Sequence, residues 1–190
     1  FILTDDHGYA DLGAQGVVSD IKTPHLDQLA KTGVRMTSGY VTAPQCTPSR
    51  AALMTGRYQQ KFGVEDNNYS PLPLTQATLA EKLSAVGYKT GIMGKWHLDV
   101  NGASKRWYDE VYAPGSSVPF NENNIPFAEK LKYYPESRGF QDNFVGYYTN
   151  YRANYTLAGN SISPRNIRDE RFRVDVISDA AVTFIERHKA

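Results

Sequence analysis

Residues 87–97 read GYKTGIMGKWH, and this stretch decides the fold class. Its first part, residues 88–93, predicts a short strand between two glycines. Immediately before it, Thr78 and Glu81 have the spacing of a capping box, which predicts a helix that begins after Thr78 and ends at Gly87. A helix followed directly by a strand is typical of α/β domains.

The N-terminal part of the chain repeats this alternation. Residues 1–4 predict one strand and residues 34–37 another. Between them, Thr23 as N-cap and Pro24 as the first helical residue predict a helix that ends at Gly33.

Further along the chain, a helix is predicted from near Ser49 to Gly56, and the apolar spacing of residues 173–188 predicts a last helix. Residues 98–170 are rich in Pro, Gly, Asn and Ser, which favours only short elements that cross over the top of the sheet. We therefore expect an α/β fold whose largely parallel sheet is flanked by helices.

Composition limits the classes of protein to consider. The 190 residues include 21 Lys and Arg against 20 Asp and Glu, a formal net charge of +1. This balance favours neither a nucleic-acid partner nor a membrane surface, and no apolar run is long enough for a membrane span. The chain opens on a predicted strand and stops after a helix that lacks a partner. We expect residues 1–190 to be one domain that is incomplete at both ends.

Three groups of polar residues follow predicted strands or precede predicted helices, where α/β sheets bind ligands. The first is Asp5 and Asp6, two adjacent carboxylates. Because they repel each other, they indicate a cation, and their hard oxygens suit Ca²⁺ or Mg²⁺. A solvated turn is the alternative.

The second group is residues 46–50, CTPSR, which contain the single cysteine of the chain. Cys46 precedes a predicted helix, whose N-terminus stabilises anions and lowers the pKa of a thiol. Arg50 adds a fixed positive charge one turn later. The alternative is a small buried side chain, which is the common role of an unpaired cysteine.

The third group is Lys95 and His97. Alternate residues of an extended segment point the same way, so this pair would present an ammonium and an imidazole together. A surface lysine and a core histidine are the alternative.

Taken together, these motifs resemble the type I sulfatases of the alkaline-phosphatase-like superfamily, over about residues 1–146. Residues 46–50 match the C-x-P-S-R signature of that family and residues 51–58, AALMTGRY, its usual continuation. Residues 87–97 match the second signature, G-Y-x-T-x-x-x-G-K-W-H. Residues 4–9, TDDHGY, are similar to its opening metal-binding segment, and residues 23–27 and 138–140 follow in the familiar order. The resemblance implies the N-terminal part of a sulfatase catalytic domain with an alkaline-phosphatase-like sandwich fold.

The resemblance also implies a nucleophile made from Cys46. In this family a formylglycine-generating enzyme oxidises the signature cysteine to an aldehyde, whose hydrate carries two hydroxyls on one carbon. One hydroxyl would attack sulfur and release the alcohol, and the other would re-form the aldehyde as sulfate leaves. Asp5, Asp6 and the group derived from Cys46 would bind Ca²⁺, with Mg²⁺ as an alternative.

The remaining roles are implied in the same way. Arg50 would support the hydrate, Lys95 would contact the sulfate, and His97 would take a proton as sulfate leaves, so Lys95 and His97 also count as substrate-binding residues. We expect His25 to be a surface residue and His188 to be solvated. The other metal and sulfate ligands of the family have no counterpart in these 190 residues.

Two other functions remain open from the sequence. One is a phosphate or phosphonate ester hydrolase of the same superfamily, and the other is a binding protein that has lost the chemistry. Aromatic residues gather between positions 107 and 155, and we expect most of them to pack. If some line a cleft, a sulfated glycan is favoured over a sulfated small molecule. A secreted or periplasmic location is the expectation for the family.

Overall fold

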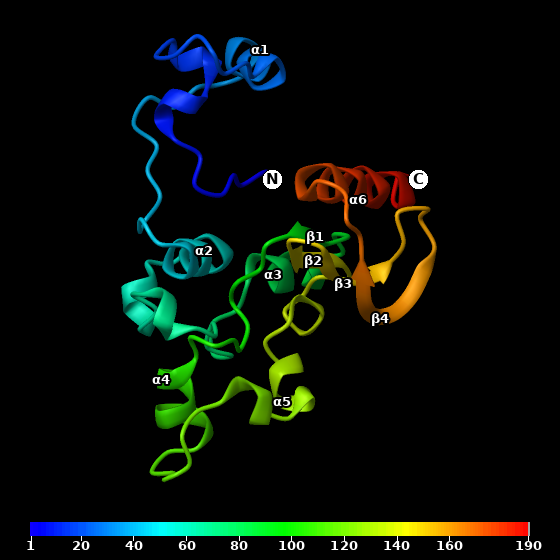
Figure 1. Ribbon diagram of the computed structural model, residues 1–190. Helices are drawn as coiled ribbons and strands as arrows, with labels where there is room; N and C mark the ends of the chain where they lie inside the picture. Colours follow the sequence, from blue (N-terminus) through cyan, green and yellow to red (C-terminus); the bar gives the residue numbers. More distant parts are fainter. Residues whose placement is uncertain (190) are drawn as a thin grey trace. The chain divides into compact units, whose positions relative to one another are not determined.

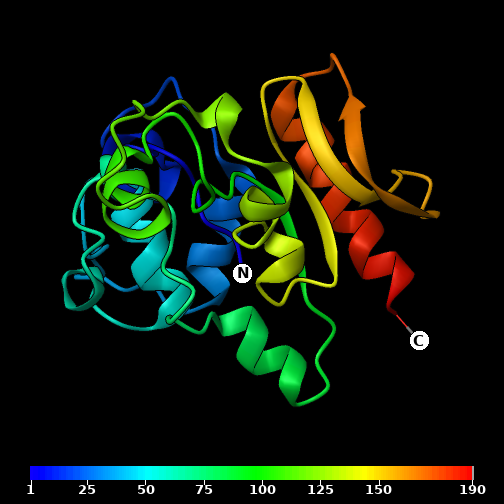
Figure 2. The same cartoon turned by 90° about the horizontal axis from the view of Figure 1, so that it is seen from below.

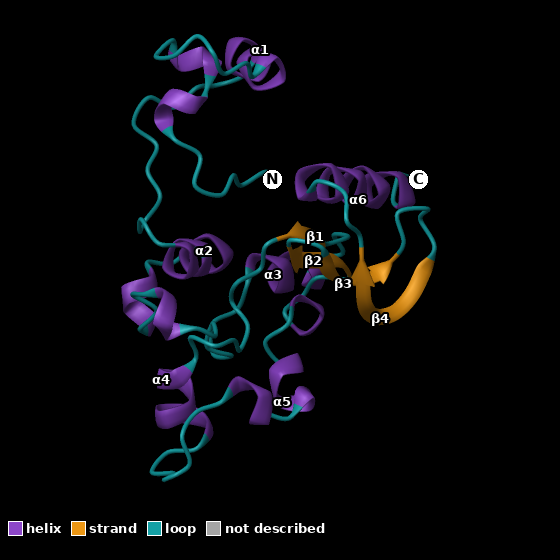
Figure 3. Ribbon diagram, in the orientation of Figure 1, coloured by secondary structure: helices purple, strands orange, loops and turns teal. Residues whose placement is uncertain are grey.

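The computed structural model describes residues 1–189, which form two compact units, Phe1–Val41 and a second unit that begins at Thr42. Figure 1 labels the elements along the chain, and Figure 3 shows that, within the described residues, strands occur only in the second unit. The helices are α1 (Pro24–Thr32), α2 (Cys46–Thr55), α3 (Leu79–Ala85), α4 (Lys105–Trp107), α5 (Phe127–Leu131) and α6 (Arg173–Arg187), and the strands are β1 (Gly91–Gly94), β2 (Asp142–Tyr147), β3 (Asn150–Tyr155) and β4 (Ser161–Arg168).

The first unit contains the helix that its sequence predicts. Pro24 is the first residue of α1 and Gly33 caps its end. The Thr23 side chain does not cap the helix backbone. Instead, its hydroxyl accepts a hydrogen bond from the Gly13 amide at 2.8 Å and donates one to Asp27 at 2.9 Å. Thr23 therefore holds α1 to the preceding turn.

Both strands predicted in this unit are wrong. Residues 1–4 and 34–37 are irregular. Their apolar side chains are exposed, with Phe1 at 96% and Val34 at 86%. A strand forms only when its N–H and C=O groups pair with a neighbouring strand, and within the described residues these segments have none.

The second unit contains a mixed sheet with the strand order β1-β2-β3-β4. Strands β1 and β2 are parallel, whereas β2–β3 and β3–β4 are antiparallel. The α/β class is confirmed, but among the described strands the parallel pairing expected for most of the sheet is seen only between β1 and β2. Strands β2 to β4 lie within residues 98–170, where the sequence predicts only short crossing elements.

Helix α6 covers one face of this sheet, as Figure 2 shows along β2 and β3. It confirms the helix predicted over residues 173–188. Val176 and Ala180 are fully buried against an aromatic layer made by Phe144, Tyr151 and Tyr155. The outer members of the predicted apolar stripe, such as Val174 and Ile185, are exposed instead.

In the helices that precede β1, the start of α3 and the end of α2 lie where local signals predict. The Thr78 side chain accepts a hydrogen bond from the Glu81 amide, and the Glu81 side chain accepts one from the Thr78 amide. These two bonds are the expected capping box of α3. Gly56 ends α2 in the left-handed conformation that glycine favours. However, α2 begins at Cys46, three residues earlier than predicted.

Arg138 joins the loop before α3 to the segment before β2. Its side chain is 2% exposed and lies 3.5 Å from the Glu81 carboxylate. It also donates hydrogen bonds to the main-chain oxygens of Leu72 and Gln76. Next to it, Gly139 has a φ of +88°, and a Cβ there would lie 2.3 Å from the Glu81 amide nitrogen. The close approach explains why this position is glycine.

Most aromatic residues of the predicted stretch pack, as expected. Trp107, Tyr108 and Tyr133 are buried in one cluster near α4 and the π-helix Tyr108–Tyr112. The Trp107 ring nitrogen donates to the Tyr133 hydroxyl at 2.9 Å. None of the helices in residues 1–189 is both long and apolar enough to cross a membrane.

Candidate active site

The thiol of Cys46 and the ammonium of Lys95 meet within the second unit. Cys46 is the first residue of α2, and Lys95 directly follows β1. The Lys95 Nζ donates to the Cys46 Sγ over 3.1 Å. Sequence reasoning predicted both residues, and the structure brings them into direct contact although 49 positions separate them.

A short segment, Asp66 and Asn67, fixes the chain on both sides of Cys46. The Gln45 side chain donates to the Asp66 carboxylate at 3.1 Å, and the Thr47 amide donates to the Asn67 side chain at 2.9 Å. Hydrogen bonds, first from the Asn68 amide and then from Gln45, hold the pKa of Asp66 below its ordinary value. This segment carries no signal that links it to the cysteine, because the two are remote along the chain.

These contacts reduce the number of backbone N–H donors that the start of α2 can offer to an anion. The Thr47 amide is already bonded to Asn67, and Pro48 has no amide hydrogen. Two donors that a helix N-terminus usually offers are therefore taken or missing. A positive group that does reach Cys46 is the Lys95 ammonium, and the helix dipole adds to its effect.

Buried neighbours hold the segment that carries Lys95 and His97. Trp96 and Leu98 are buried in the core beside α2, and the Trp96 ring nitrogen donates to the Tyr133 main-chain oxygen at 2.9 Å. With these two anchored, Lys95 and His97 both reach the first turn of α2. The His97 Nδ1 lies 3.5 Å from the Thr47 hydroxyl, and His97 has a φ of +60°.

Arg50 supports this arrangement from α2. Its Nη1 donates to the main-chain oxygen of Lys95 at 2.7 Å. The guanidinium thus links α2 to the residue that follows β1. Lys95 is therefore held to α2 through its main chain by Arg50 and through its side chain by Cys46. This contact adds a structural role to the charge that the sequence suggested.

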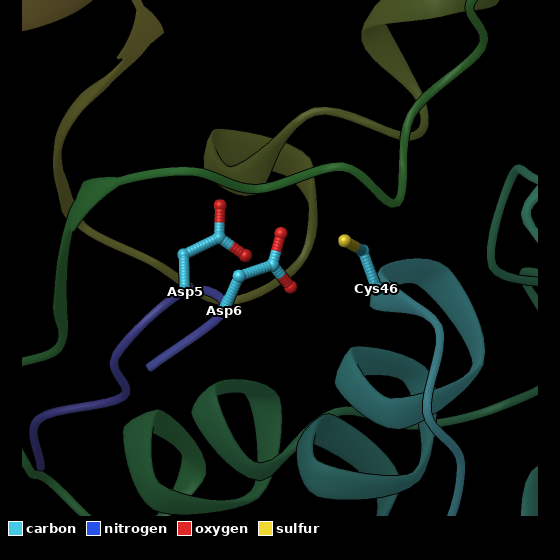
Figure 4. Close-up of side chains that lie close together, drawn as sticks. All are labelled: Asp5, Asp6 and Cys46. Carbon is cyan, nitrogen blue, oxygen red and sulfur yellow. The ribbon is translucent and has the colours of Figure 1, made fainter. Parts of the chain in front are cut away.

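The two predicted acidic ligands lie together in the first unit. Their carboxylate oxygens lie within 4.8 Å of each other, and Figure 4 shows the side chains next to one another. Asp6 has a φ of +53°, which breaks the alternation that would turn adjacent side chains apart. Paired carboxylates are suitable donors for Ca²⁺ or Mg²⁺. Cys46 belongs to the second unit, so the three-residue metal site stays a prediction.

The other histidines have local roles. His25 is exposed on the first turn of α1, as expected. The His7 ring shares a hydrogen bond of 3.0 Å with the main-chain oxygen of Asp11. The prediction that His188 is solvated is wrong, because it lies 3.0 Å from the buried carboxylate of Asp142.

Tyr147 is a neighbour of the site that sequence reasoning missed. The Lys95 Nζ lies 5.2 Å from the centre of its ring, which is within the range of a cation–π contact. Tyr147 ends β2, the parallel neighbour of β1, so both residues stand at the same edge of the sheet. Because the sequence did not reveal β2, it could not place this ring beside Lys95.

The fold matches that of known structures. A crystal structure titled Ps i-CgsB in complex with k-i-k-neocarrahexaose aligns with a TM-score of 0.66 and 27% identity, over 96% of this chain and 40% of the other. The similarity confirms the alkaline-phosphatase-like class of fold expected from the sequence.

The sulfatase family model matches residues 1–177, and the chain belongs to this family. Arylsulfatase A of Bos taurus is 53% identical over 104 residues, which are 52% of this chain and 20% of that protein. Arylsulfatase J of Mus musculus is 50% identical over 103 residues, 52% of this chain and 17% of that protein. The matched part thus spans about a fifth of each relative.

Proposed function

We propose that the protein carrying this chain hydrolyses sulfate esters with a nucleophile derived from Cys46. The observation that carries the proposal is the contact of 3.1 Å between the Lys95 ammonium and the Cys46 sulfur at the start of α2. A nucleophile with a cation beside it suits an anionic substrate, because the cation neutralises charge that builds up on the sulfate.

The chemistry requires that Cys46 be converted to formylglycine, which membership of the sulfatase family supports. One hydroxyl of the aldehyde hydrate loses its proton and attacks sulfur; the new S–O bond forms as the bond between sulfur and the alcohol oxygen breaks, and the leaving oxygen takes up a proton to depart as the alcohol. The second hydroxyl then loses its proton and the carbonyl re-forms, which breaks the bond between carbon and the sulfate oxygen. Two oxygens on one carbon are needed, so an unmodified thiol cannot complete this sequence.

The residues around Cys46 take separate parts in these steps. Lys95 contacts a sulfate oxygen and holds its charge during attack. His97 accepts the proton of the second hydroxyl as sulfate leaves. Arg50 keeps Lys95 in place through the main-chain oxygen of that residue.

Asp5 and Asp6 are the proposed ligands of a divalent cation, Ca²⁺ by analogy with the family, together with the group made from Cys46. The support within the chain is the pair of adjacent carboxylates in the first unit. A cation bound there would supply positive charge, which would lower the pKa of the attacking hydroxyl and attract the sulfate.

The proposed substrate is a sulfated carbohydrate. Support comes from the structural neighbour described in complex with a neocarrahexaose, and from the exposed Tyr147 beside Lys95, on which the exposed Tyr148 packs. Tyrosine rings offer an apolar face and a hydroxyl, which suits a sugar ring.

We also propose that residues 1–190 form the N-terminal part of a longer catalytic domain, because the matched segment covers only 20% of the bovine relative. Maturation by a formylglycine-generating enzyme and a secreted or periplasmic location follow from the family and belong to the same proposal.

The test compares two esters of one phenol. The whole protein is produced with a formylglycine-generating enzyme, and kcat/KM is measured for 4-nitrophenyl sulfate and 4-nitrophenyl phosphate. The proposal expects the sulfate to be cleaved at least tenfold more efficiently, and Cys46→Ala to abolish its cleavage. A preference for phosphate would identify a phosphate ester hydrolase instead. No turnover of either ester after complete conversion would favour a binding protein.

A further inference from the structure

We propose that Arg173, Tyr147 and Tyr148 form a subsite for a second anionic group, so that the substrate is a sugar carrying a sulfate or carboxylate beside the sulfate that is cleaved. This inference rests on the proposed function, since it assigns the scissile sulfate to Lys95 and Cys46. It adds a binding site at Arg173, which also lies next to the Tyr147 ring.

The ring of Tyr147 lies near two positively charged side chains. Its ring centre lies 5.2 Å from the Lys95 Nζ and 5.7 Å from the Arg173 guanidinium carbon. One half-exposed ring thus stands next to two cations, of which one touches Cys46. The cations come from different elements, the end of β1 and the start of α6, and both are at the edge of the sheet where β1 and β2 end. Ligands of α/β sheets bind at this edge.

Arg173 has charge available for a ligand. Its neighbours Arg168 and Arg171 pair with carboxylates, as does Arg187 at the other end of α6. By contrast, among residues 1–189 no carboxylate lies within ion-pair distance of Arg173. Its guanidinium lies over the ring of Tyr147. A guanidinium held against an aromatic face keeps its fork of N–H donors for a sulfate or carboxylate.

Tyr148 is exposed and has a backbone conformation that is unfavourable for a tyrosine. It opens the two-residue turn between β2 and β3 with a φ of +58°, a position where hairpins favour Gly or Asn. Its side chain is 70% exposed and packs edge-to-face on Tyr147. The Tyr151 hydroxyl donates to its main-chain oxygen at 2.7 Å, which fixes the turn. A strained, exposed and rigidly held aromatic residue next to a reactive site suggests a binding role.

Together these residues describe the ligand. The scissile sulfate lies at Lys95, the sugar ring lies on the two tyrosines, and a second anionic group reaches Arg173. A neutral aglycone, such as a nitrophenyl group, would use the tyrosines but not Arg173. The subsite therefore selects sugars with two anionic groups.

The first experiment measures binding without turnover. In a Cys46→Ala background of the whole protein, calorimetry gives Kd for size-matched disaccharides that carry one sulfate, two sulfates, or one sulfate and one uronic carboxylate. We expect either form with two anionic groups to bind about 10-fold to 100-fold tighter, and Arg173→Ala to remove this preference. The control Arg168→Ala removes an equal charge at an exposed pair and should preserve it.

A result in which the preference is absent, or survives Arg173→Ala, overturns the subsite. Comparison of the two forms with two anionic groups shows whether the second group is sulfate or carboxylate. Because no cleavage is needed, a protein that binds with this pattern but does not hydrolyse 4-nitrophenyl sulfate would contradict the proposed function and leave the subsite intact.

The second experiment uses the strain at Tyr148. Tyr148→Gly should raise Tm, since glycine adopts positive φ freely, and at the same time weaken disaccharide binding about fivefold. Tyr148→Phe should retain binding, and the control Tyr88→Ala, at another exposed tyrosine, should change neither. If Tyr148→Gly raises Tm and leaves Kd unchanged, the tyrosine does not contact the sugar and the proposal fails.

Discussion

Replacement of Lys95 by alanine tests the core of the active site. In the structure, the Lys95 Nζ lies 3.1 Å from the Cys46 sulfur, so the ammonium stands within reach of a sulfate attacked from that position. The truncation should spare the local backbone, because Arg50 bonds the main-chain oxygen of Lys95 and not its side chain. The variant therefore removes one charge and little structure.

The expected loss follows from electrostatics. Two unit charges about 4 Å apart interact by about 4 kcal/mol at an effective dielectric constant of about 20. Removal of one donor from an oxyanion site costs about 2.7–4 kcal/mol, or about 10²–10³ in kcat. The two figures agree, so we expect Lys95→Ala to lower kcat by 100-fold to 1,000-fold.

The assay is hydrolysis of 4-nitrophenyl sulfate by the whole protein, with the converted fraction of Cys46 measured by mass spectrometry in each sample. Rates are expressed per converted site, which separates catalysis from maturation. Lys89→Ala removes an exposed lysine just before β1 and serves as the control, with a rate expected within twofold of the parent. A loss of less than fivefold in Lys95→Ala at full conversion would refute the role of this ammonium.

Three further predictions concern stability. Leu98 is fully buried, so Leu98→Ala should lower the free energy of unfolding by about 2–5 kcal/mol in urea titrations; a change under 1 kcal/mol would contradict its place in the core. Arg138→Ala leaves buried main-chain oxygens without donors and should cost about 3–5 kcal/mol by the same measurement, whereas a neutral result would show that they rebond. Burial raises the pKa of Asp99 to about 6 from its ordinary 3.8. The folded state then holds a proton that the unfolded state releases. The stabilisation from this proton is complete below pH about 4 and is lost as pH rises to about 6, which lowers the free energy of unfolding by roughly 3 kcal/mol. Asp99→Asn should remove this decline, and an unchanged pH profile would contradict it.

Helix ends could be predicted because their signals are local. The capping box of Thr78 and Glu81 and the left-handed Gly56 depend on residues within one turn, and both are present in the structure. The beginning of α2 was missed because its cap is remote: the Thr47 amide bonds to Asn67, 20 residues away. Local signals place the start of the helix only near Ser49.

Strands form only with neighbouring strands, and these cannot be identified from the local sequence. Residues 1–4 are as apolar as a strand, yet they are irregular here, whereas β3 was overlooked although its residues alternate in burial. The turn between β2 and β3 uses Tyr148 at positive φ instead of Gly or Asn, so the usual hairpin signal is absent.

The site residues were easier to predict than the sheet. Cys46, Lys95 and His97 stand in motifs with fixed spacing, and the structure gathers them at the start of α2. Tyr147 and Arg173 carry no motif, and only the register of β1 with β2 and the packing of α6 bring them near Lys95.

The most direct test of the central claim is the rate of sulfate release plotted against the fraction of Cys46 converted to formylglycine. Samples of the whole protein with graded conversion supply the points. We predict a straight line through the origin, because only converted sites turn over. Sulfate release at zero conversion, or none at complete conversion, would contradict it.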